Sequence, residues 1–571
     1  MRLDKFTIGS AKDSPTHQFK NLKNVTIDFD QGHWVTVVIG WNGSGKSNVL
    51  EALAIIFRDL IGKKRTPEFA FKLAYSMGSS NAMRHIHIDA DPDRVKSPFI
   101  IHVASAAEYN QAAHIASLLE FDNPDDTPPG NMMKLTTFLS EDEPNLPKYV
   151  FSYYSGESTR MHEVFRPYLE SYDNKLRNGE DPGLKRLFYA MPVHSQFVLL
   201  AFLIQQTDVV RKFLDKHLGL DPDEGIESVL FVLRQPPWKS KAVDGDPRFW
   251  NARGVVRDFL ARVYDIALAP IQIKRRIPVS LWNEKELEFQ YLYIKDIESL
   301  RKLVGNQSPA KFFRDLESTY VSELIEEIRI RVRLKKNDGS VTFRELSEGE
   351  QQLLTVLGLL RFTSENESLF LLDEPDTHLN PRWCADYLKY LQDFVGKEEK
   401  DRATSHIVFT THNPLAIAEL EKQQVQILKR DEESKRVAAF KPELDPRGMG
   451  YAGIVTSDMF GLASSLDSHT QDLLEEKRQL TLKEQPLSEV ERKSLETINV
   501  ELEGYGFRYS MRDPVYEEYL RARYSANEKQ PVEKQMTSLT TAERMVKAKE
   551  LIEKAAKKVR EEQESDGNAA Y

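Results

Sequence analysis

The chain has 571 residues, a formal net charge of −10 at pH 7 and 40% hydrophobic residues. That length allows two or more domains with sizeable cores, and the charge argues against a uniformly basic nucleic-acid surface without excluding a local one. No apolar run reaches about eighteen residues and no charged start leads into an apolar stretch, so we expect neither a membrane span nor a secretory signal. The only cysteine, Cys384, excludes an intrachain disulfide and predicts a reducing, cytoplasmic location.

The first motif in chain order is a phosphate-binding loop. Residues 40–47 are Gly-Trp-Asn-Gly-Ser-Gly-Lys-Ser, between an apolar run over 34–39 that predicts a strand and a helical pattern over 48–57. The glycines let backbone N–H groups surround phosphate oxygens, and the N-terminus of the following helix adds to the attraction. The alternative is a glycine turn without a ligand. The residues expected to contact a nucleotide are Gly40, Asn42, Gly43, Ser44, Gly45, Lys46, Ser47 and Asn48.

Two residues of this loop have more specific expected roles. Lys46 should reach the β and γ phosphates of a nucleoside triphosphate, and the hydroxyl of Ser47 should ligate Mg²⁺. The loop alone therefore predicts triphosphate binding but no particular use of it.

A long interval separates this loop from the next motif. Prolines and aromatic residues interrupt it repeatedly, so it lacks the sustained heptads of a coiled coil, and we expect a globular, mainly helical insertion over 101–310. Helices are predicted over 195–213 and 254–266, and a strand over 287–293. Gln196 is a weak candidate for a glutamine near the nucleotide, and an ordinary position on a helix surface is the favoured alternative.

The best local candidate for a basic surface is the segment 328–335, in which aliphatic and basic residues alternate. A period of two predicts a strand with one aliphatic and one basic face. Residues 337–339, Asn-Asp-Gly, predict a hairpin turn into a partner strand over 340–343. The solvated outer face of an antiparallel sheet is the favoured interpretation, and a phosphate-backbone contact is the alternative.

The next segment, Ser347-Glu348-Gly349-Glu350, precedes a helix predicted over 351–360. A serine and a glycine at a helix N-terminus make a second anion site in a chain that already has one phosphate loop.

Two further strands are predicted to end at polar residues. The apolar run over 369–372 leads into Asp373 and Glu374, and the run over 407–409 is followed by His412. The carboxyl ends of buried parallel strands are where α/β proteins place their ligands. Asp373 suits Mg²⁺ or its water shell, Glu374 suits a base that polarises water, and His412 suits a hydrogen bond to a γ phosphate. The alternatives are a solvated acidic pair at a helix start and a structural histidine.

After residue 430 the sequence is charged and helical, mainly over 470–524 and 540–563, with disorder expected over 567–571. It contains no pair of acidic motifs and no His-Asn-His cluster typical of a nuclease, and the acidic run over 89–93 predicts a turn. The expected domains are the N-terminal half of a nucleotide-binding head with the phosphate loop (1–100), the insertion (101–310), the C-terminal half of that head with the later motifs (311–430), a helical partner-binding domain (431–525) and a charged helix with a tail (526–571).

The four motifs, in this order, resemble those of ABC-type ATPases. The resemblance implies an α/β fold with an ABC-type P-loop ATPase head, a mixed sheet, a mainly helical insertion and a helical C-terminal region, with ATP and Mg²⁺ as cofactors. It implies that Glu374 and His412 are catalytic and that Ser347, Gly349 and Glu350 bind the γ phosphate held by a second subunit. Asp376 corresponds to the D-loop, which contacts the opposite subunit. Two chains would then enclose two ATP molecules.

Further segments resemble particular groups within the ABC-type ATPases. Residues 19–22, Phe-Lys-Asn-Leu, and the pair Ser47-Asn48 resemble SMC-related ATPases, and the run 373–381 resembles a subgroup that includes overcoming-lysogenization-defect nucleases. The segments 153–156, 457–462 and 513–516 resemble the PtuA-like ATPases of Septu systems and of retrons that carry a Septu pair.

This resemblance implies a homodimeric or larger regulatory ATPase of phage defence that controls a separate HNH-type nuclease, PtuB-like, and no membrane. A reverse transcriptase and its noncoding RNA would be further partners in a retron. Glu348 stands where the family has glycine, and we expect it to slow hydrolysis or tighten its control.

Two alternatives remain. An SMC-related repair ATPase that clamps nucleic acid would need basic head surfaces and usually a coiled coil. A self-sufficient nuclease of the overcoming-lysogenization-defect type would need metal-binding acidic residues after 430. The sequence has neither the heptads of a coiled coil nor such acidic residues after 430.

Overall fold

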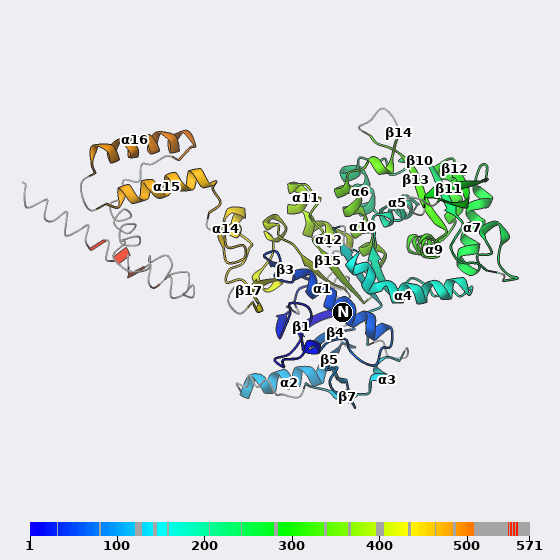
Figure 1. Ribbon diagram of the computed structural model, residues 1–571, viewed down its shortest axis with the longest axis horizontal. Coiled ribbons are helices and arrows are strands. Elements are labelled where there is room, and N and C mark those ends of the chain that lie inside the picture. Colours follow the sequence, from blue (N-terminus) through cyan, green and yellow to red (C-terminus); the bar gives the residue numbers. More distant parts are fainter. Residues whose placement is uncertain are drawn as a thin grey trace, which may run out of the picture. The chain divides into compact units, whose positions relative to one another are not determined.

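The structure, a computed structural model, describes residues 1–507 with gaps at 31, 79–81, 120–127, 141–144, 157–158, 205, 241, 279–283, 336–339, 364–366, 396–404, 432–434, 463 and 484–486, and a few residues between 546 and 557. The predicted turn at 337–339, the segment 513–516, the tail at 567–571 and most of the helix over 540–563 lie outside the described residues. The chain forms two compact units, Met1–Ile454 and Val455–Tyr571 (Figure 1).

A seven-stranded sheet is the centre of the first unit. Its order is β18-β17-β3-β16-β15-β8-β9, and all neighbours are parallel except β17 and β18. Every residue of β15 and β16 is buried, as expected for parallel strands covered on both faces. The strands are β3 (Val35–Gly40), β8 (Tyr149–Tyr154), β9 (Leu187–Ala190), β15 (Ser368–Asp373), β16 (Ser405–Thr410), β17 (Val425–Arg430) and β18 (Val437–Phe440).

A second sheet, six-stranded and antiparallel, shares a hydrophobic core with the central sheet. Helix α1 (Lys46–Ile61) contributes to that core on nearly every side, because Val49–Phe57 are all buried. A helix that is apolar all round needs cover on all faces, and the two sheets provide it. The order is β2 (Val25–Asp28), β1 (Arg2–Ile8), β4 (Phe71–Met77), β5 (Arg84–Ala90), β6 (Phe99–Ser105) and β7 (Asn131–Met133), with α2 (Ala106–Leu119) and α3 (Leu135–Phe138) nearby.

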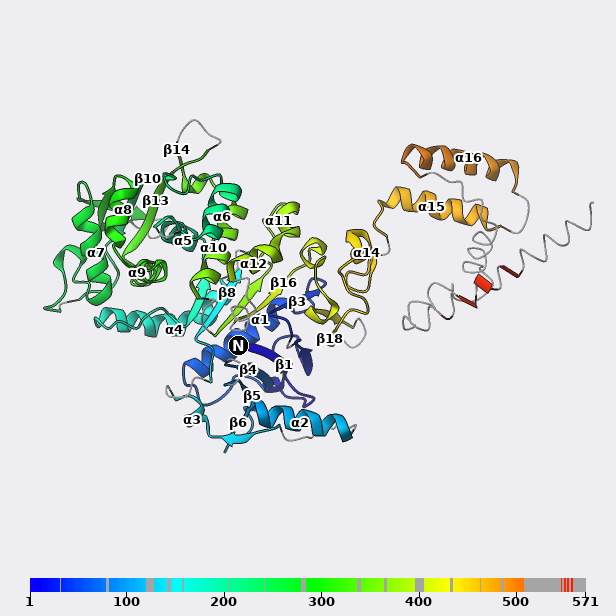
Figure 2. The same cartoon turned by 180° about the vertical axis from the view of Figure 1, so that it is seen from behind.

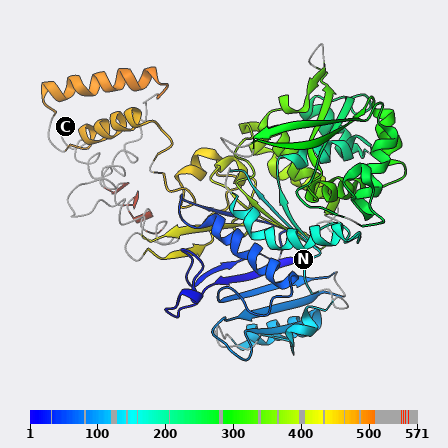
Figure 3. The same cartoon turned by 45° about the vertical axis from the view of Figure 1, so that its right-hand side comes forward.

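A third sheet has five antiparallel strands and lies in a lobe on the other side of the central sheet from the six-stranded sheet (Figure 3). Its order is β11 (Ile271–Pro278), β12 (Glu284–Ile294), β10 (Ile226–Arg234), β13 (Ile325–Arg333) and β14 (Ser340–Thr342). The described α-helices between β8 and β16 along the chain are α4 (Arg160–Arg177), α5 (Val193–Ile204), α6 (Asp208–Leu218), α7 (Gly254–Ile266), α8 (Ile297–Val304), α9 (Pro309–Val321), α10 (Glu348–Thr363), α11 (Pro381–Ala385) and α12 (Tyr387–Val395).

Residues 101–310 contain more helix than strand where the structure describes them, but they also supply strands to the sheets. They supply β8 and β9 to the central sheet and β10–β12 to the third sheet. Short apolar runs such as β9, Leu-Phe-Tyr-Ala, fit a buried strand and a buried helix equally well by periodicity. The single helix expected over 195–213 is two helices, because the Thr207 side chain accepts a hydrogen bond from the backbone N–H of Val210 and starts α6.

Strand β13 has the alternation that its sequence predicts. Ile328, Ile330 and Val332 are buried, whereas Arg329, Arg331 and Arg333 are exposed. The first two residues of the acidic run 89–93 are the last two residues of β5. Only the last three residues of the run form the expected turn.

A buried ionic cluster joins α5, α9 and the segment before β9. Glu317 of α9 accepts hydrogen bonds from Lys185 and from His194, and all three side chains are at most 2% exposed. Burial alone would raise the pKa of Glu317, but the charges of Lys185 and His194 outweigh it and lower that pKa from 4.5 to about 2.

The second unit is described over two helices, α15 (Ser468–Thr481) and α16 (Glu489–Gly504), which pack against each other (Figure 2). Asp467 and Ser488 cap their N-termini, and Ser494 donates a hydrogen bond to Glu476 across the pair at 2.9 Å. Helix α14 (Gly450–Thr456) precedes them along the chain.

Candidate nucleotide-binding site

The strands that carry the motifs end at one edge of the central sheet. Strand β16 lies between β3 and β15, and in the register Thr410 is opposite Val38 on one side and Asp373 on the other. Because these strands are parallel, the phosphate loop after β3, the acidic pair at the end of β15 and the segment before His412 emerge together. This edge is where doubly wound sheets bind ligands.

The phosphate loop is shaped by three glycines with positive φ. These are Gly40 (152°), Gly43 (80°) and Gly45 (99°), and side chains rarely tolerate such conformations. A side chain at Gly40 would also collide with the carbonyl of Leu428 in β17. Helix α1 begins directly after Gly45, so its first backbone N–H groups face the loop.

Two polar side chains inside the loop fit a phosphate ligand. Lys46 is 6% exposed, and its ammonium donates to the carbonyl oxygen of Gly40 at 2.8 Å. Burial lowers its pKa, and the nearby carboxylates of Glu374 and Asp373 partly offset that shift. The Ser44 hydroxyl oxygen is buried with no hydrogen-bond partner among the residues that the structure describes. A buried polar atom of this kind needs a partner, and a phosphate oxygen would supply one.

The acidic pair combines a buried and a partly exposed carboxylate. Asp373 is 1% exposed and accepts a hydrogen bond from Thr410, and burial raises its pKa while hydrogen bonds from Thr410 and Ser47 oppose that rise. Ser47 and Asp373 thus place two oxygen ligands side by side, which fits Mg²⁺.

Glu374 has a φ of 51°, and its backbone N–H donates to the carbonyl and hydroxyl oxygens of Thr410, both at 3.1 Å. The Nδ1 atom of His412 lies 3.3 Å from a carboxylate oxygen of Glu374. Both side chains remain accessible, at 27% for Glu374 and 57% for His412. The geometry therefore brings a carboxylate and an imidazole into contact on the open side of the site.

The segment expected to bind a second subunit's nucleotide forms the N-terminus of α10. Ser347 accepts a hydrogen bond from the N–H of Glu350, and the Glu350 carboxylate accepts from the N–H and hydroxyl of Ser347 at 2.8 and 2.9 Å. Glu350 therefore caps its own helix. Glu348 is 83% exposed and lies 3.4 Å from Nδ1 of His378.

This helix start is packed against the segment that contains Asp376. A Cβ atom at Gly349 would lie 2.5 Å from the carbonyl oxygen of His378, so only glycine fits there. Asp376 is buried and accepts a hydrogen bond from Thr411 at 2.8 Å, which ties it to the segment before His412.

Residues outside the phosphate loop support it from neighbouring segments. Asn21 donates to the carbonyl of Gly43 at 3.1 Å and accepts from Asn48 at 2.7 Å, so residues 19–22 brace the phosphate loop. Arg160, at the start of α4, pairs with Glu51 of α1 at 3.0 Å.

Strand β8 brings a further segment to the same edge. Tyr154 is opposite Asp373, and the Ser155 hydroxyl donates to Thr377 at 3.3 Å. Gln196, by contrast, lies on α5, which packs on α9 and α10 rather than at this edge. The resemblance of residues 153–156 marked this segment without a place in the fold, because the position of Ser155 depends on the pairing of β8 with β15.

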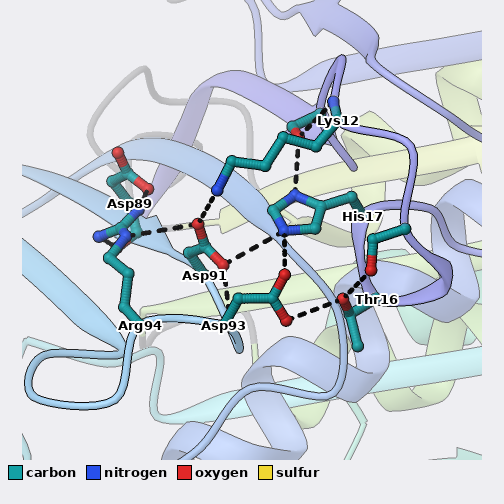
Figure 4. A network of polar contacts seen from close by, with 9 residues as sticks. Lys12, Thr16, His17, Asp89, Asp91, Asp93 and Arg94 are labelled. Atoms are coloured by element: carbon teal, nitrogen blue, oxygen red, sulfur yellow. Dashed lines mark hydrogen bonds and ion pairs between the residues drawn. The ribbon is translucent and has the colours of Figure 1, made fainter.

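One other group of side chains has the spacing of metal ligands among the described residues: His17, Asp91 and Asp93 (Figure 4). His17 is 2.9 Å from Asp93 and 3.4 Å from Asp91, but Asp91 also pairs with Lys12 at 3.0 Å and with Arg94. Two cations already compensate Asp91, and Asp93 accepts a hydrogen bond from Thr16. The group therefore acts as an ion-pair network that fastens the segment after β1 to the turn after β5.

Comparison with known proteins agrees with this geometry. Residues 17–148 match the family described as "AAA ATPase domain", and residues 234–418 match the family described as "AAA domain, putative AbiEii toxin, Type IV TA system". The first match contains the phosphate loop, and the second contains Ser347, the acidic pair and His412. These matches and the fold fit an α/β P-loop ATPase with a mixed central sheet.

Three curated relatives have defence-system names. "Septu protein PtuA" of Bacillus mycoides (strain KBAB4) is 26% identical over 161 residues, which are 26% of this chain and 22% of PtuA. "Retron Vc95 probable ATPase" of Vibrio cholerae serotype O1 biovar El Tor is 24% identical over 184 residues (29% and 33% of the two chains), and "Retron Ec83 probable ATPase" of Escherichia coli is 28% identical over 171 residues (28% and 29%).

The chain is similar to PtuA-like AAA ATPases over parts of its length. The matched regions span about a fifth to a third of the relatives' own length. None of the helices in the described part of this PtuA-like chain combines the length and apolar character needed to cross a membrane.

Proposed function

We propose that this chain is the ATP-binding and ATP-hydrolysing regulatory subunit of an anti-phage defence complex in the cytoplasm. Its head is of the ABC type and SMC-related, and two copies enclose ATP between them. ATP occupancy controls a separate HNH-type nuclease. In a retron, a reverse transcriptase and its noncoding RNA complete the complex.

One structural feature, the N-terminus of α10, supports the proposed dimer. Helix α10 presents Ser347 at its N-terminus, Glu348 beside it is solvent-exposed, and Gly349 is packed tightly on the segment of Asp376. A helix N-terminus attracts anions, and this one is separate from the N-terminus of α1, which serves the chain's own phosphate loop. A second copy would offer its α10 to the γ phosphate that the first copy holds.

The site chemistry follows from the positions of the side chains. Lys46 and the loop amides bind the β and γ phosphates, while Ser47 and Asp373 hold Mg²⁺, which would neutralise charge on the phosphate oxygens. Glu374 orients and polarises the attacking water. His412, whose Nδ1 atom lies 3.3 Å from the Glu374 carboxylate, hydrogen-bonds the γ phosphate. Ser347 of the second copy would stabilise the charge that develops there, since phosphoryl transfer depends mainly on positioning and electrostatics.

The names of the relatives support the biological setting. One is a Septu protein and two are retron ATPases, and all three align with parts of this ATPase chain. Helices α15 and α16 form a separate unit outside the ATPase, which suits attachment of a nuclease subunit.

The proposal is tested by purifying the tagged chain from its native operon, with and without ATP, and identifying every protein and nucleic acid that accompanies it. Recovery of a small His-Asn-His protein would support a regulated nuclease. Recovery of DNA without such a protein would contradict it and favour a repair-type clamp. The Lys46→Ala variant controls for nucleotide dependence, because its loop lacks the ammonium that holds the phosphates.

A further inference from the structure

The third sheet has one covered face and one open face. The covered face carries Val229, Phe231 and Leu233 of β10, which are all buried, and the ring of Phe231 lies 6.4 Å from that of Phe259 in α7. Side chains alternate between the two faces along a strand. The intervening residues of β10, and the residues paired with them in β12 and β13, therefore lie on the opposite face from α7.

The register of the sheet arranges these residues in rows. Leu230 of β10 is opposite Tyr293 of β12 on one side and Arg329 of β13 on the other, and Ser228 is opposite Arg331. Residues that are paired in this way lie about 4.5–5.5 Å apart. We call this surface the open face. The members that matter below are Arg275, Tyr291, Tyr293, Arg329, Arg331 and Arg333.

Large apolar and aromatic side chains of the open face are in contact with solvent. Tyr293 is 38% exposed, and Ile271 and Ile273 of β11 are exposed as well. Tyr291 is half-buried, and its hydroxyl accepts a hydrogen bond from Arg275 at 2.8 Å. The solvated face of an antiparallel sheet usually carries polar residues instead. The open face therefore offers ring surfaces to a ligand.

Arginines lie beside these rings, and two of them have no counter-charge. Arg329 pairs with Glu327 at 3.0 Å, and Arg344 pairs with the same carboxylate at 2.6 Å. Arg331 and Arg333 are exposed and form no ion pair within the described part of the chain. A solvated pair of this kind is free to bind an anionic group.

The segments of this sheet that lie outside the described residues carry no net charge. Residues 279–283 are Val-Ser-Leu-Trp-Asn, and residues 336–339 are Lys-Asn-Asp-Gly, so one lysine and one aspartate cancel. They do not offset the charge of Arg331 and Arg333. Residues two apart on a strand lie about 6.6 Å from each other, so the two guanidinium groups can contact successive phosphates of one strand.

We propose that the open face binds single-stranded nucleic acid, with a base stacked on Tyr293 and the phosphate backbone held by Arg331 and Arg333. Aromatic rings on a sheet, flanked by basic side chains, are a recurrent means of binding single strands. The planar guanidinium group also matches phosphate oxygens through two N–H donors. A duplex fits less well, because its bases are stacked on one another and leave Tyr293 without a partner.

The open face is joined along the chain to the N-terminus of α10. Strand β14 leads into a short 3-10 helix, Phe343–Glu345, which is followed by Ser347. Arg344 of that helix pairs with Glu327, which also engages Arg329 on the open face. Any coupling between nucleic acid here and ATP would be reciprocal. The inference itself depends on neither the proposed dimer nor the nuclease.

Direct binding to the full chain tests the inference. A fluorescein-labelled oligothymidylate of about 12 nucleotides is titrated with the protein, and anisotropy is recorded at several salt concentrations. We expect Arg331→Glu/Arg333→Glu to weaken binding about tenfold or more and to lower the slope of log K against log salt by about 1.4, from two lost phosphate contacts. Tyr293→Ala should weaken binding about fivefold or more at an unchanged slope, because it removes stacking and no charge.

Two matched variants control for charge and for the ring. Lys274→Glu/Arg276→Glu reverses two exposed charges of β11 on the other face of the same sheet, and it should bind like the parental chain. Tyr293→Phe keeps the ring and should bind like the parental chain as well. Thermal unfolding establishes that each variant folds.

Three results of these titrations would overturn the inference. They are a parental chain that binds no oligonucleotide, a Lys274/Arg276 variant that loses as much affinity as the Arg331/Arg333 variant, and a Tyr293→Ala variant that binds like the parental chain. Competition by a duplex of the same length or by an acidic peptide, as strong as that by the unlabelled oligonucleotide, would also overturn it. The open face would then recognise negative charge alone.

Discussion

Glu374 has an unusual backbone conformation for its residue type. Its φ of 51° is sparsely populated for side-chain-bearing residues, and two hydrogen bonds from its N–H to Thr410 hold it there. That turn directs the carboxylate away from the buried strand and toward His412. The strain is local, and it separates the exposed Glu374 from the buried Asp373 although the two are adjacent in sequence.

We expect Glu374→Gln to retain ATP binding and to lower hydrolysis at least about a hundredfold, because an amide cannot accept a proton from water. Phosphate release measures hydrolysis, and the fluorescence of Trp41, 66% exposed in the phosphate loop, measures binding. Lys46→Ala is the contrasting variant and should lose binding itself. A Gln variant that hydrolyses ATP at the parental rate would show that Glu374 is not the base.

At the scale of elements, tight packing joins α10 to the segment of Asp376. Gly349→Ala would place a methyl group 2.5 Å from the His378 carbonyl, so the two segments must separate. We expect this variant to bind ATP normally and to lose ATP-dependent self-association, as followed by light scattering. Gly504 of α16 is the control, since a side chain there meets nothing within 4 Å. Equal self-association by the Gly349 and Gly504 variants would count against a role for this helix start.

The cluster of Glu317, Lys185 and His194 gives the protein an acid-sensitive contribution to its stability. The folded-state pKa of Glu317, about 2, lies below its ordinary value of 4.5, so the ionised carboxylate stabilises the fold above pH 4.5. That contribution is lost as the pH falls from 4.5 toward 2.

Glu317→Gln should therefore lower the free energy of unfolding by about 3 kcal/mol at pH 7, because it leaves the buried Lys185 ammonium without a counter-charge. Urea denaturation measures the loss. The difference from the parental chain should shrink as the pH falls below 4.5. Glu326→Gln removes a partly exposed ion pair with Arg234, at 2.9 Å, and should cost less than about 1 kcal/mol. Equal losses in the two variants would contradict the argument.

The elements that carry motifs could be predicted from the sequence, and several others could not. The apolar runs at 34–39, 369–372 and 407–409 are β3, β15 and β16 to within two residues, because each is short, apolar apart from Thr36, and followed by a polar motif. Strands β8 and β9 were not predicted as parts of the central sheet, because their partners are distant in sequence. For the same reason the positions of Asn21, Ser155 and Arg160 at the site follow only from tertiary packing.

At the scale of the whole molecule, the chain divides into a large ATPase unit and a smaller unit that begins at Val455. A chain that ends at residue 466, just before the Asp467 cap of α15, keeps every element of the ATP site. We expect it to bind and hydrolyse ATP like the full chain and to lose the nuclease subunit on co-purification. Retention of that subunit would assign its attachment to the ATPase unit instead.

The central sheet also has a consequence for the order of events during synthesis. Strand β3 leaves the ribosome early, but both of its neighbours, β16 and β17, come from residues 405–430. At about 5–20 residues per second, translation leaves the phosphate loop without its supporting strands for roughly 20–70 s. A nascent chain can therefore acquire a complete ATP site only when about three-quarters of it has been made, and a chain terminated prematurely before residue 405 would contain an intact phosphate-loop sequence yet be unable to use ATP.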